Sequence, residues 1–425
     1  MQHHSSRAIT IWLTIVGFLV VFLVLFGGWV RLTRSGLSIV EWKVITGILP
    51  PLTQEAWERE FAEYQQTPEF QKIHYAMTLP EYEFIYYNEY IHRLVARLTG
   101  LLFVLPLFYF LWQGIIPWRK SGIYLLIGLG FAFQGWLGWY MVSSGLVDRP
   151  SVSHYRLTAH LLAALTLLAL CFWAGLDNVY GRERPLDRPQ RRSAQALAVL
   201  MVAILLLQIA YGGLVAGLKA GHASSTWPLM FGRLIPPGLL SYVEPWWKNL
   251  VEVPVTVHYV HRWLAFVVLL AVFLVYWVAR KRGFYTAVRQ GLFWLLGLVS
   301  LQIALGVSVI WFRVPVWLAL VHQGTAITLL LLALYLNHRI RYAQPCPSHR
   351  DRHRSPPGQK CVEKGWTQIC DLAFEMVTIW PNHLRQTRTV PREFVTAPAM
   401  RPFPSKTRQC SPQTVKNPAG RRFAG

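Results

Sequence analysis

The sequence predicts an all-α membrane protein with about eight transmembrane helices, arranged as two tandem, pseudo-symmetric four-helix bundles. Of its 425 residues, 53% are hydrophobic and 15% are charged. The apolar residues gather in runs long enough to cross about 30 Å of hydrocarbon, and several motifs occur once in each half of the chain. We expect spans at residues 9–30, 90–110, 123–141, 155–173, 194–216, 256–279, 291–310 and 316–336.

A repeated series of motifs divides the chain into two halves. The matching pairs are Gly27 and Gly212, Gly28 and Gly213, Arg34 and Lys219, Gly36 and Gly221, Trp42 and Trp227, Gln134 and Gln302, and Gly138 and Gly306. We assign the glycines to helix packing, since small residues let helices approach closely in lipid. The predicted parts are a short N-terminus (1–8), a first half (9–175), a linker (176–193), a second half (194–338) and a basic, proline-rich, disordered tail (339–425).

Basic residues predict the orientation of the spans. The formal net charge is +22, and Lys and Arg concentrate in the tail and in the short loops that share one side with both termini. The positive-inside rule therefore places both termini in the cytoplasm, and a bacterial inner membrane is the simplest location. This topology explains the charge without a nucleic-acid partner. The 5 cysteines form no pattern typical of a disulfide or zinc framework.

Four histidines are the candidate ligands of two haem groups. His92 and His160 fall in the first half, and His261 and His322 in the second. We expect each to lie six or seven residues into its span, which places all four in one layer roughly 10 Å below the outer surface. A lone membrane histidine often forms a hydrogen bond between helices, but four at matched depth in a duplicated register favour axial ligands of haem iron. His154 and His258 are weaker candidates.

The two halves differ one helical turn outward from the first ligand. The first half has Glu89 at that position and the second has His258. This difference predicts that the reaction takes place in the first half and that the second half has a supporting role. Glu89 could accept a proton or stabilise developing positive charge. The alternative is a structural salt bridge from Glu89 to Arg93.

Several segments resemble the haem A synthase family, in the form found in proteobacteria and mitochondria. They are residues 27–42 (GGWVRLTRSGLSIVEW), Glu89-x-x-His92-Arg93, residues 152–160 (VSHYRLTAH), residues 220–237 with TWPLM at 226–230, and His261-Arg262. The likeness extends from the first span to about Asn337 and excludes the tail. In one branch of this family the first outer loop carries a cysteine pair, and this chain has no Cys between Arg31 and Glu89.

The resemblance implies an enzyme that oxidises the C8 methyl group of haem O to a formyl group, by successive hydroxylation. The product would be haem A for the assembly of cytochrome c oxidase. By the same resemblance, His92, His160 and Glu89 belong to the haem O site, while His261 and His322 hold a haem b cofactor. The implied partners are haem O synthase, an unidentified electron-transfer partner and membrane lipid. Homo-oligomerisation stays open.

Two other functions are compatible with histidines in membrane helices. A cytochrome b-type quinol oxidoreductase also holds haems by paired histidines, but such proteins generally stack two haems at different depths, with two ligands on one helix about fourteen residues apart. This chain has one candidate ligand on each helix, at one depth. A non-catalytic haem carrier is the second alternative, and in such a protein Glu89 would have no necessary role.

Overall fold

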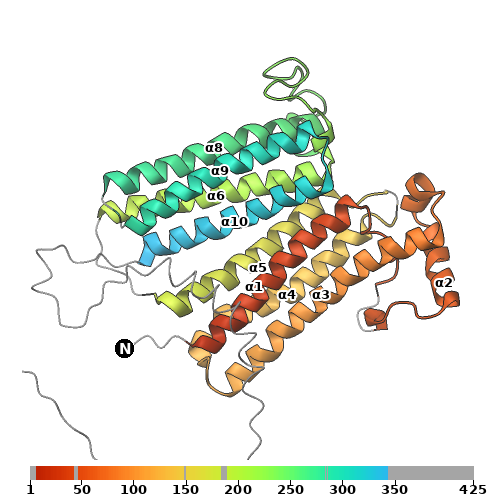
Figure 1. Cartoon of the computed structure of the whole chain (residues 1–425), viewed down its shortest axis with the longest axis horizontal. Helices are drawn as coiled ribbons and strands as arrows, with labels where there is room; N and C mark the ends of the chain where they lie inside the picture. The colour runs from red at the N-terminus through yellow and green to blue at the C-terminus, as the bar shows by residue number, and fades with distance from the viewer. Residues whose placement is uncertain are drawn as a thin grey trace, which may run out of the picture. The chain divides into compact units, whose positions relative to one another are not determined.

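The computed structural model describes residues 6–42, 46–147, 150–182, 189–282, 284 and 286–342, which form an all-α multi-pass membrane protein (Figure 1). The predicted disorder of the tail after Tyr342 lies outside the described residues. Within these ranges there is no β-strand, and eight helices are long and apolar enough to cross a membrane. They are α1 (Arg7–Leu32), α3 (Leu79–Trp112), α4 (Gly122–Ser143), α5 (His154–Tyr180), α6 (Pro189–Gly217), α8 (Pro254–Lys281), α9 (Thr286–Trp311) and α10 (Val316–Tyr342).

The helices of each half pack in the same cyclic order. In the first half, α1 contacts α3 and α5, and α4 contacts the same two helices. In the second half, α6 contacts α8 and α10, and α9 contacts the same two. Contacts of α1 with α10, and of α5 with α6 and α10, join the halves. Below, the outer end means the end at which α3, α5, α8 and α10 begin, following the predicted orientation.

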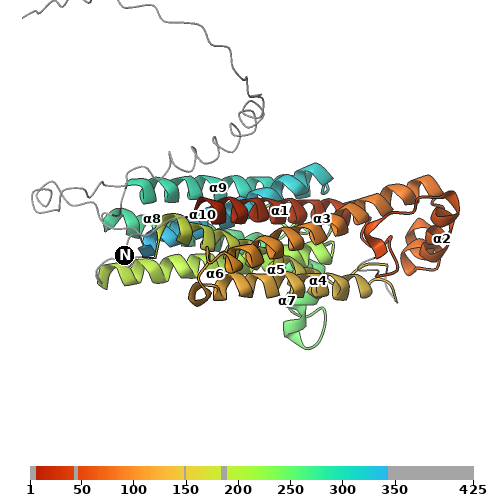
Figure 2. The same ribbon diagram turned by 90° about the horizontal axis from the view of Figure 1, so that it is seen from below.

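Seven of the eight helices begin within five residues of the predicted starts, but α3 begins eleven residues early, at Leu79 instead of 90. Its start is fixed by a capping box, in which the Thr78 backbone N–H and hydroxyl both donate to Glu81 Oε2 at 2.8 Å. The outer part of α3 packs with α2 (Gln54–Gln65) through a cluster that includes Trp57, Tyr64 and Tyr82. This extension projects beyond the bundle along the direction of α3 (Figures 1 and 2).

A buried polar contact joins the two halves near the inner end. His338 on α10 is fully buried, and its Nε2 lies 3.1 Å from Asp177 Oδ1 on α5. Arg182 Nε donates to the other carboxylate oxygen of Asp177 at 2.8 Å. Because His338 and Asp177 are 161 positions apart in the chain, their contact depends on the packing of one half against the other.

Candidate functional site

The four predicted histidines form two pairs, one in each half. His92 on α3 is close enough to His160 on α5 for the two side chains to interact electrostatically, and the same holds for His261 on α8 and His322 on α10. His160, His261 and His322 lie six, seven and six residues after the first residue of their helices, as expected. The expected spacing was wrong for His92, which lies thirteen residues into α3 and only two residues after the predicted start of its span, because the helix begins in the outer extension.

Each of these histidine rings packs against a glycine of a neighbouring helix, so close that a Cβ would crowd the ring. Such an atom would lie 3.0–3.3 Å from the ring. The pairs are Gly27 with His92, Gly138 with His160, Gly212 with His261, and Gly306 with His322. Helix packing was the expected role of these glycines, and their contact with the histidines was not predicted. The signal was present in the repeat, since all four occupy duplicated positions.

Three of the four histidines also have a glutamine neighbour on an adjacent helix. The Nε2 of the glutamine donates to the backbone oxygen of the histidine at 2.9–3.0 Å and lies 3.2–3.5 Å from a ring nitrogen. These pairs are Gln134 with His160, Gln208 with His261, and Gln302 with His322. The role of Gln208 was missed by the sequence analysis.

His92 is the exception among the four. Gln208 lies four residues before Gly212, and the residue four before Gly27 in the first half is Leu23. His92 instead has an aromatic neighbour, Phe26, whose ring lies 6.4 Å away and nearly parallel, at 14°. His92 also has a hydrogen bond to the backbone of Leu23. The first half therefore lacks a side-chain amide beside one of its histidines, where the second half has Gln208 beside His261.

The chemistry of these pairs fits haem. Among the described residues, no three His, Cys, Asp or Glu side chains cluster closely enough to hold a bare metal ion. Two imidazoles on facing helices suit an iron whose remaining positions are filled by a macrocycle. The buried Nδ1 of His322 has no hydrogen-bond partner, and the residue of the neighbouring helix that contacts each ring has no side chain. Each half could thus hold one haem between two helices.

Glu89 is buried, with 3% of its surface exposed, and its carboxylate accepts four hydrogen bonds. Its Oε2 accepts from the backbone N–H and the hydroxyl of Ser38, both at 2.8 Å, and from Ile39 N at 3.0 Å. Its Oε1 accepts from Arg93 at 2.5 Å. The salt bridge that the sequence analysis weighed as an alternative is therefore present, and the carboxylate also holds the segment that follows α1.

An arginine binds the equivalent outer segment in each half. Arg93 donates to the backbone oxygens of Ile39 and Glu41 at 3.1 and 3.4 Å, and its guanidinium lies 4.7 Å from the ring centre of Trp42. The second half repeats this arrangement, and each contacted residue lies 185 positions after its counterpart in the first half. There the partners of Arg262 are Ser224 O at 3.1 Å, Thr226 O at 2.9 Å and the Trp227 ring at 5.9 Å.

His258 takes the place of Glu89 in this second arrangement. It is buried, and its Nε2 accepts a hydrogen bond from Arg262 Nε at 3.1 Å. This bond uses a ring nitrogen that a haem ligand would need, so His258 serves as a partner of the arginine. His154, at the start of α5, packs against Gly217 of α6 at the entrance of its span.

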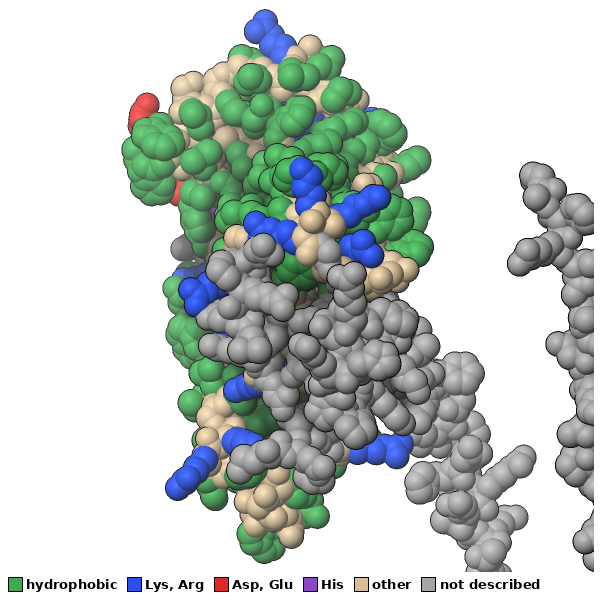
Figure 3. All heavy atoms as spheres, turned by 90° about the vertical axis from the view of Figure 1, so that its left-hand side faces the viewer, with side chains coloured by type: hydrophobic (Ala, Val, Ile, Leu, Met, Phe, Trp, Pro, Cys, Tyr) green, Lys and Arg blue, Asp and Glu red, His purple; other side chains and the backbone are tan. Residues whose placement is uncertain are grey.

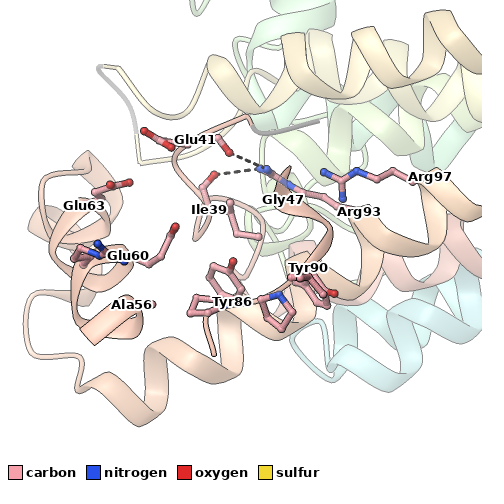
Figure 4. A pocket seen from close by; sticks show the side chains of 14 residues that line it. Ile39, Glu41, Gly47, Ala56, Glu60, Glu63, Tyr86, Tyr90, Arg93 and Arg97 are labelled. Carbon is pink, nitrogen blue, oxygen red and sulfur yellow. Dashed lines mark hydrogen bonds between the residues drawn. The ribbon is translucent and has the colours of Figure 1, made fainter. Parts of the chain in front are cut away.

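A charged cavity of about 520 Å³ lies beside Arg93, between α2 and α3 (Figure 4). Arg93 and Arg97 reach it from α3, together with the rings of Tyr86 and Tyr90. Arg59, Glu60 and Glu63 face it from α2. Arg93 therefore contacts both this cavity and the Glu89 carboxylate.

A second titratable group is buried in the outer extension. Glu69 is 4% exposed, and burial together with the charge of Glu89 raises its pKa to about 7. The Tyr64 hydroxyl lies 3.4 Å from Glu69 Oε2 and 2.7 Å from His74 Nδ1. His74 is half-buried, and burial lowers its pKa.

Residues 10–334 match the family of cytochrome oxidase assembly proteins. The chain belongs to this family. The match contains all four histidines, Glu89 and the three glutamines, and it ends before the tail. Membership confirms the resemblance that the motifs predicted, over the range in which they occur.

Relatives within this family are close in sequence over nearly their whole length. The heme A synthase of Agrobacterium fabrum is 44% identical over 335 residues, which cover 77% of this chain and 89% of the relative. That of Flavobacterium psychrophilum is 41% identical over 342 residues, covering 79% and 98%. That of Nitrosospira multiformis is 40% identical over 340 residues, covering 79% and 94%.

Proposed function

We propose that this protein is a heme A synthase, an oxidoreductase that converts the C8 methyl group of haem O to a formyl group. The observation that carries the proposal is the pair of duplicated bis-histidine sites in a chain that is 40–44% identical to heme A synthases. The product, haem A, would supply the assembly of cytochrome c oxidase. Haem O would come from its own synthase, and an electron-transfer partner would complete the reaction.

In this proposal the two halves have different tasks. His92 and His160 bind the iron of the substrate haem O, and His261 and His322 bind a haem b cofactor. When bound, haem b supplies a redox centre whose potential depends on its two imidazoles and dry surroundings. Gln208 and Gln302 orient both ligands of the second site through their backbone oxygens. Leu23 bonds His92 through its backbone alone and offers no side-chain amide, so one ligand of the first site has less support, which suits a haem that must enter and leave.

Glu89 is the proposed catalytic residue. It lies one turn outward of His92, on the same helix, and its counterpart in the cofactor half is the uncharged partner of an arginine, His258. A carboxylate at this position can accept a proton from the reacting carbon or stabilise positive charge that develops on it. Arg93 and the Ser38 amide hold the carboxylate in one orientation.

We place the protein in a bacterial inner membrane with both termini in the cytoplasm. Figure 3 looks at the inner end of the molecule, where Lys and Arg side chains gather around the ends of the helices. This distribution follows the positive-inside rule. Basic residues in the last turns of helices at this end include Arg119, Lys120, Arg280, Lys281, Arg339 and Arg341.

The proposal is tested by extracting haems from cells that express the chain with Glu89→Gln. We expect haem A to disappear and haem O to accumulate, while the cofactor haem remains bound. Glu58→Gln, an exposed glutamate on α2, is the matched control and should leave haem A unchanged. Unchanged haem A in Glu89→Gln would reject the catalytic assignment, and a protein that binds haem but makes no haem A in any host would be a carrier.

A further inference from the structure

The segment between α6 and α8 contains a loop, residues 231–248, whose large apolar side chains point away from the protein. We call it the aromatic loop. Trp246 and Trp247 are 57% and 50% exposed, and five further side chains of the loop are exposed to a similar degree: Phe231, Leu234, Ile235, Leu240 and Tyr242. Only Arg233, Glu244 and Lys248 carry charge. A contiguous apolar patch of this kind normally marks a binding surface.

The aromatic loop lies beside the bundle, whereas the outer extension of the first half lies beyond its end. In both views the loop leaves the bundle sideways, at the outer end where α6 stops and α8 begins (Figures 1 and 2). The extension with α2 follows the direction of α3 away from the spans. A segment directed sideways at this level meets the bilayer surface, while one directed along the helices meets water.

The composition of the two segments agrees with these positions. Helix α2 carries Glu55, Glu58, Arg59, Glu60 and Glu63 among its twelve residues, as expected of a helix in water. The aromatic loop instead combines tryptophan and tyrosine with leucine and isoleucine. Tryptophan and tyrosine are enriched where a membrane meets water, because their rings are apolar and their N–H or O–H groups reach the headgroups.

Several backbone polar groups of the aromatic loop form hydrogen bonds within the protein and do not depend on water. Asn249 is fully buried behind the loop, and its Oδ1 accepts from the backbone N–H groups of Tyr242 and Val243 at 3.0 and 3.1 Å. Its Nδ2 lies 2.7–3.1 Å from the backbone oxygens of Leu240, Val243 and Trp246. Because unpaired backbone groups are costly away from water, this asparagine removes a main obstacle to placing an irregular loop among lipids.

We infer that the aromatic loop inserts into the outer leaflet of the bilayer and anchors the second half at the membrane surface. The partner is lipid, at the level of the headgroups and the first part of the acyl chains. A second copy of the chain or another membrane protein would bury the same side chains, and the experiment below separates these cases. The inference depends on the loop and its position, and it holds whatever reaction the histidine sites perform.

The test uses the full chain with all 5 cysteines replaced by serine and one new cysteine, labelled with an environment-sensitive fluorophore. Trp247→Cys places the label on the aromatic loop, and Leu240→Cys provides a second position in case the first variant misfolds. Glu58→Cys on α2 is the control in water. Each protein is reconstituted in phosphatidylcholine vesicles, with or without lipids that carry a nitroxide near the headgroup.

We expect the nitroxide lipids to quench the loop labels and iodide to leave them unquenched. The Glu58→Cys label should be quenched by iodide and not by the nitroxide lipids. Loop labels that iodide quenches and the lipids do not would place the loop in water and overturn the inference. Labels quenched by neither would overturn it as well, since they would show that protein covers the loop. Cross-linking through the same cysteine would then show whether that protein is a second copy.

Discussion

The side-chain amide of Gln208 donates to the backbone oxygen of His261 at 3.0 Å and lies 3.3 Å from its Nδ1. No such amide lies beside His92, where Leu23 takes the position of Gln208. The histidine pairs of the two halves therefore have similar positions, but a side-chain amide bonds to both histidines in the second half and to only one in the first. In the proposed function this difference distinguishes a permanently bound cofactor from an exchangeable substrate, and exchanging the two residues between the halves tests it.

Gln208→Leu should loosen the haem of the second site. One hydrogen bond contributes about 1 kcal/mol, which corresponds to about fivefold faster haem dissociation. The rate is measured by transfer of haem to an excess of apomyoglobin. The reciprocal change Leu23→Gln should slow release from the first site, and an unchanged rate in both variants would show that the glutamine does not support its ligand.

Gly306→Ala should displace His322, because the new Cβ would lie 3.0 Å from the ring. Overpacking of this kind costs about 1–3 kcal/mol, so we expect a clear loss of haem from the second site in the absorption spectrum of the purified protein. Gly297→Ala is the control on the same helix, since nothing lies within 4 Å of the Cβ position there. Equal spectra of the two variants would contradict the proposed ligand.

Asp177→Ala should destabilise the contact between the halves. It would leave the fully buried His338 Nε2 without its hydrogen-bond partner, and an unsatisfied buried polar group costs about 1–3 kcal/mol. Thermal unfolding in detergent measures the loss. The double variant Asp177→Ala/His338→Ala should be less destabilised than the sum of the single variants, and strict additivity would show that the two side chains do not interact.

The stability of the outer extension should fall as pH rises from about 4.5 to about 7. The pKa of Glu69 is raised to about 7 from an ordinary value of 4.5, so the folded protein holds a proton that the unfolded chain releases across this interval. Nearby Arg34 and Lys219 oppose the rise, and Glu89 and the buried surroundings cause it. Hydrogen exchange of α2 at several pH values measures the effect.

Glu69→Gln should remove this pH dependence, because the amide does not titrate. The half-buried His74, whose pKa burial lowers, adds a separate loss of stability below its ordinary value of 6.5, and His74→Gln isolates that contribution. A steep dependence between pH 4.5 and 7 that persists in Glu69→Gln would assign the titration to another group.

Much of the membrane domain was predictable because hydropathy and the repeat act over long segments. Hydropathy placed seven helix starts well and failed at α3, since residues 79–89 form a helix in water that is fixed by Thr78 and Glu81. The repeat located the four histidines but concealed Gln208, whose counterpart, Leu23, is a different residue. The partners of Glu89 depended on the path of residues 38 and 39 after α1, which no local pattern specifies.

Each Gly-Gly pair has two different neighbours. Gly27 faces His92 and Gly212 faces His261, whereas Gly28 packs against Leu320 of the other half and Gly213 against Thr158 of the other half. One turn of helix thus positions a histidine and also forms part of the interface between the bundles. After duplication and fusion of a gene, the two sites could not have changed independently, since a substitution that alters this interface also displaces the neighbouring histidine.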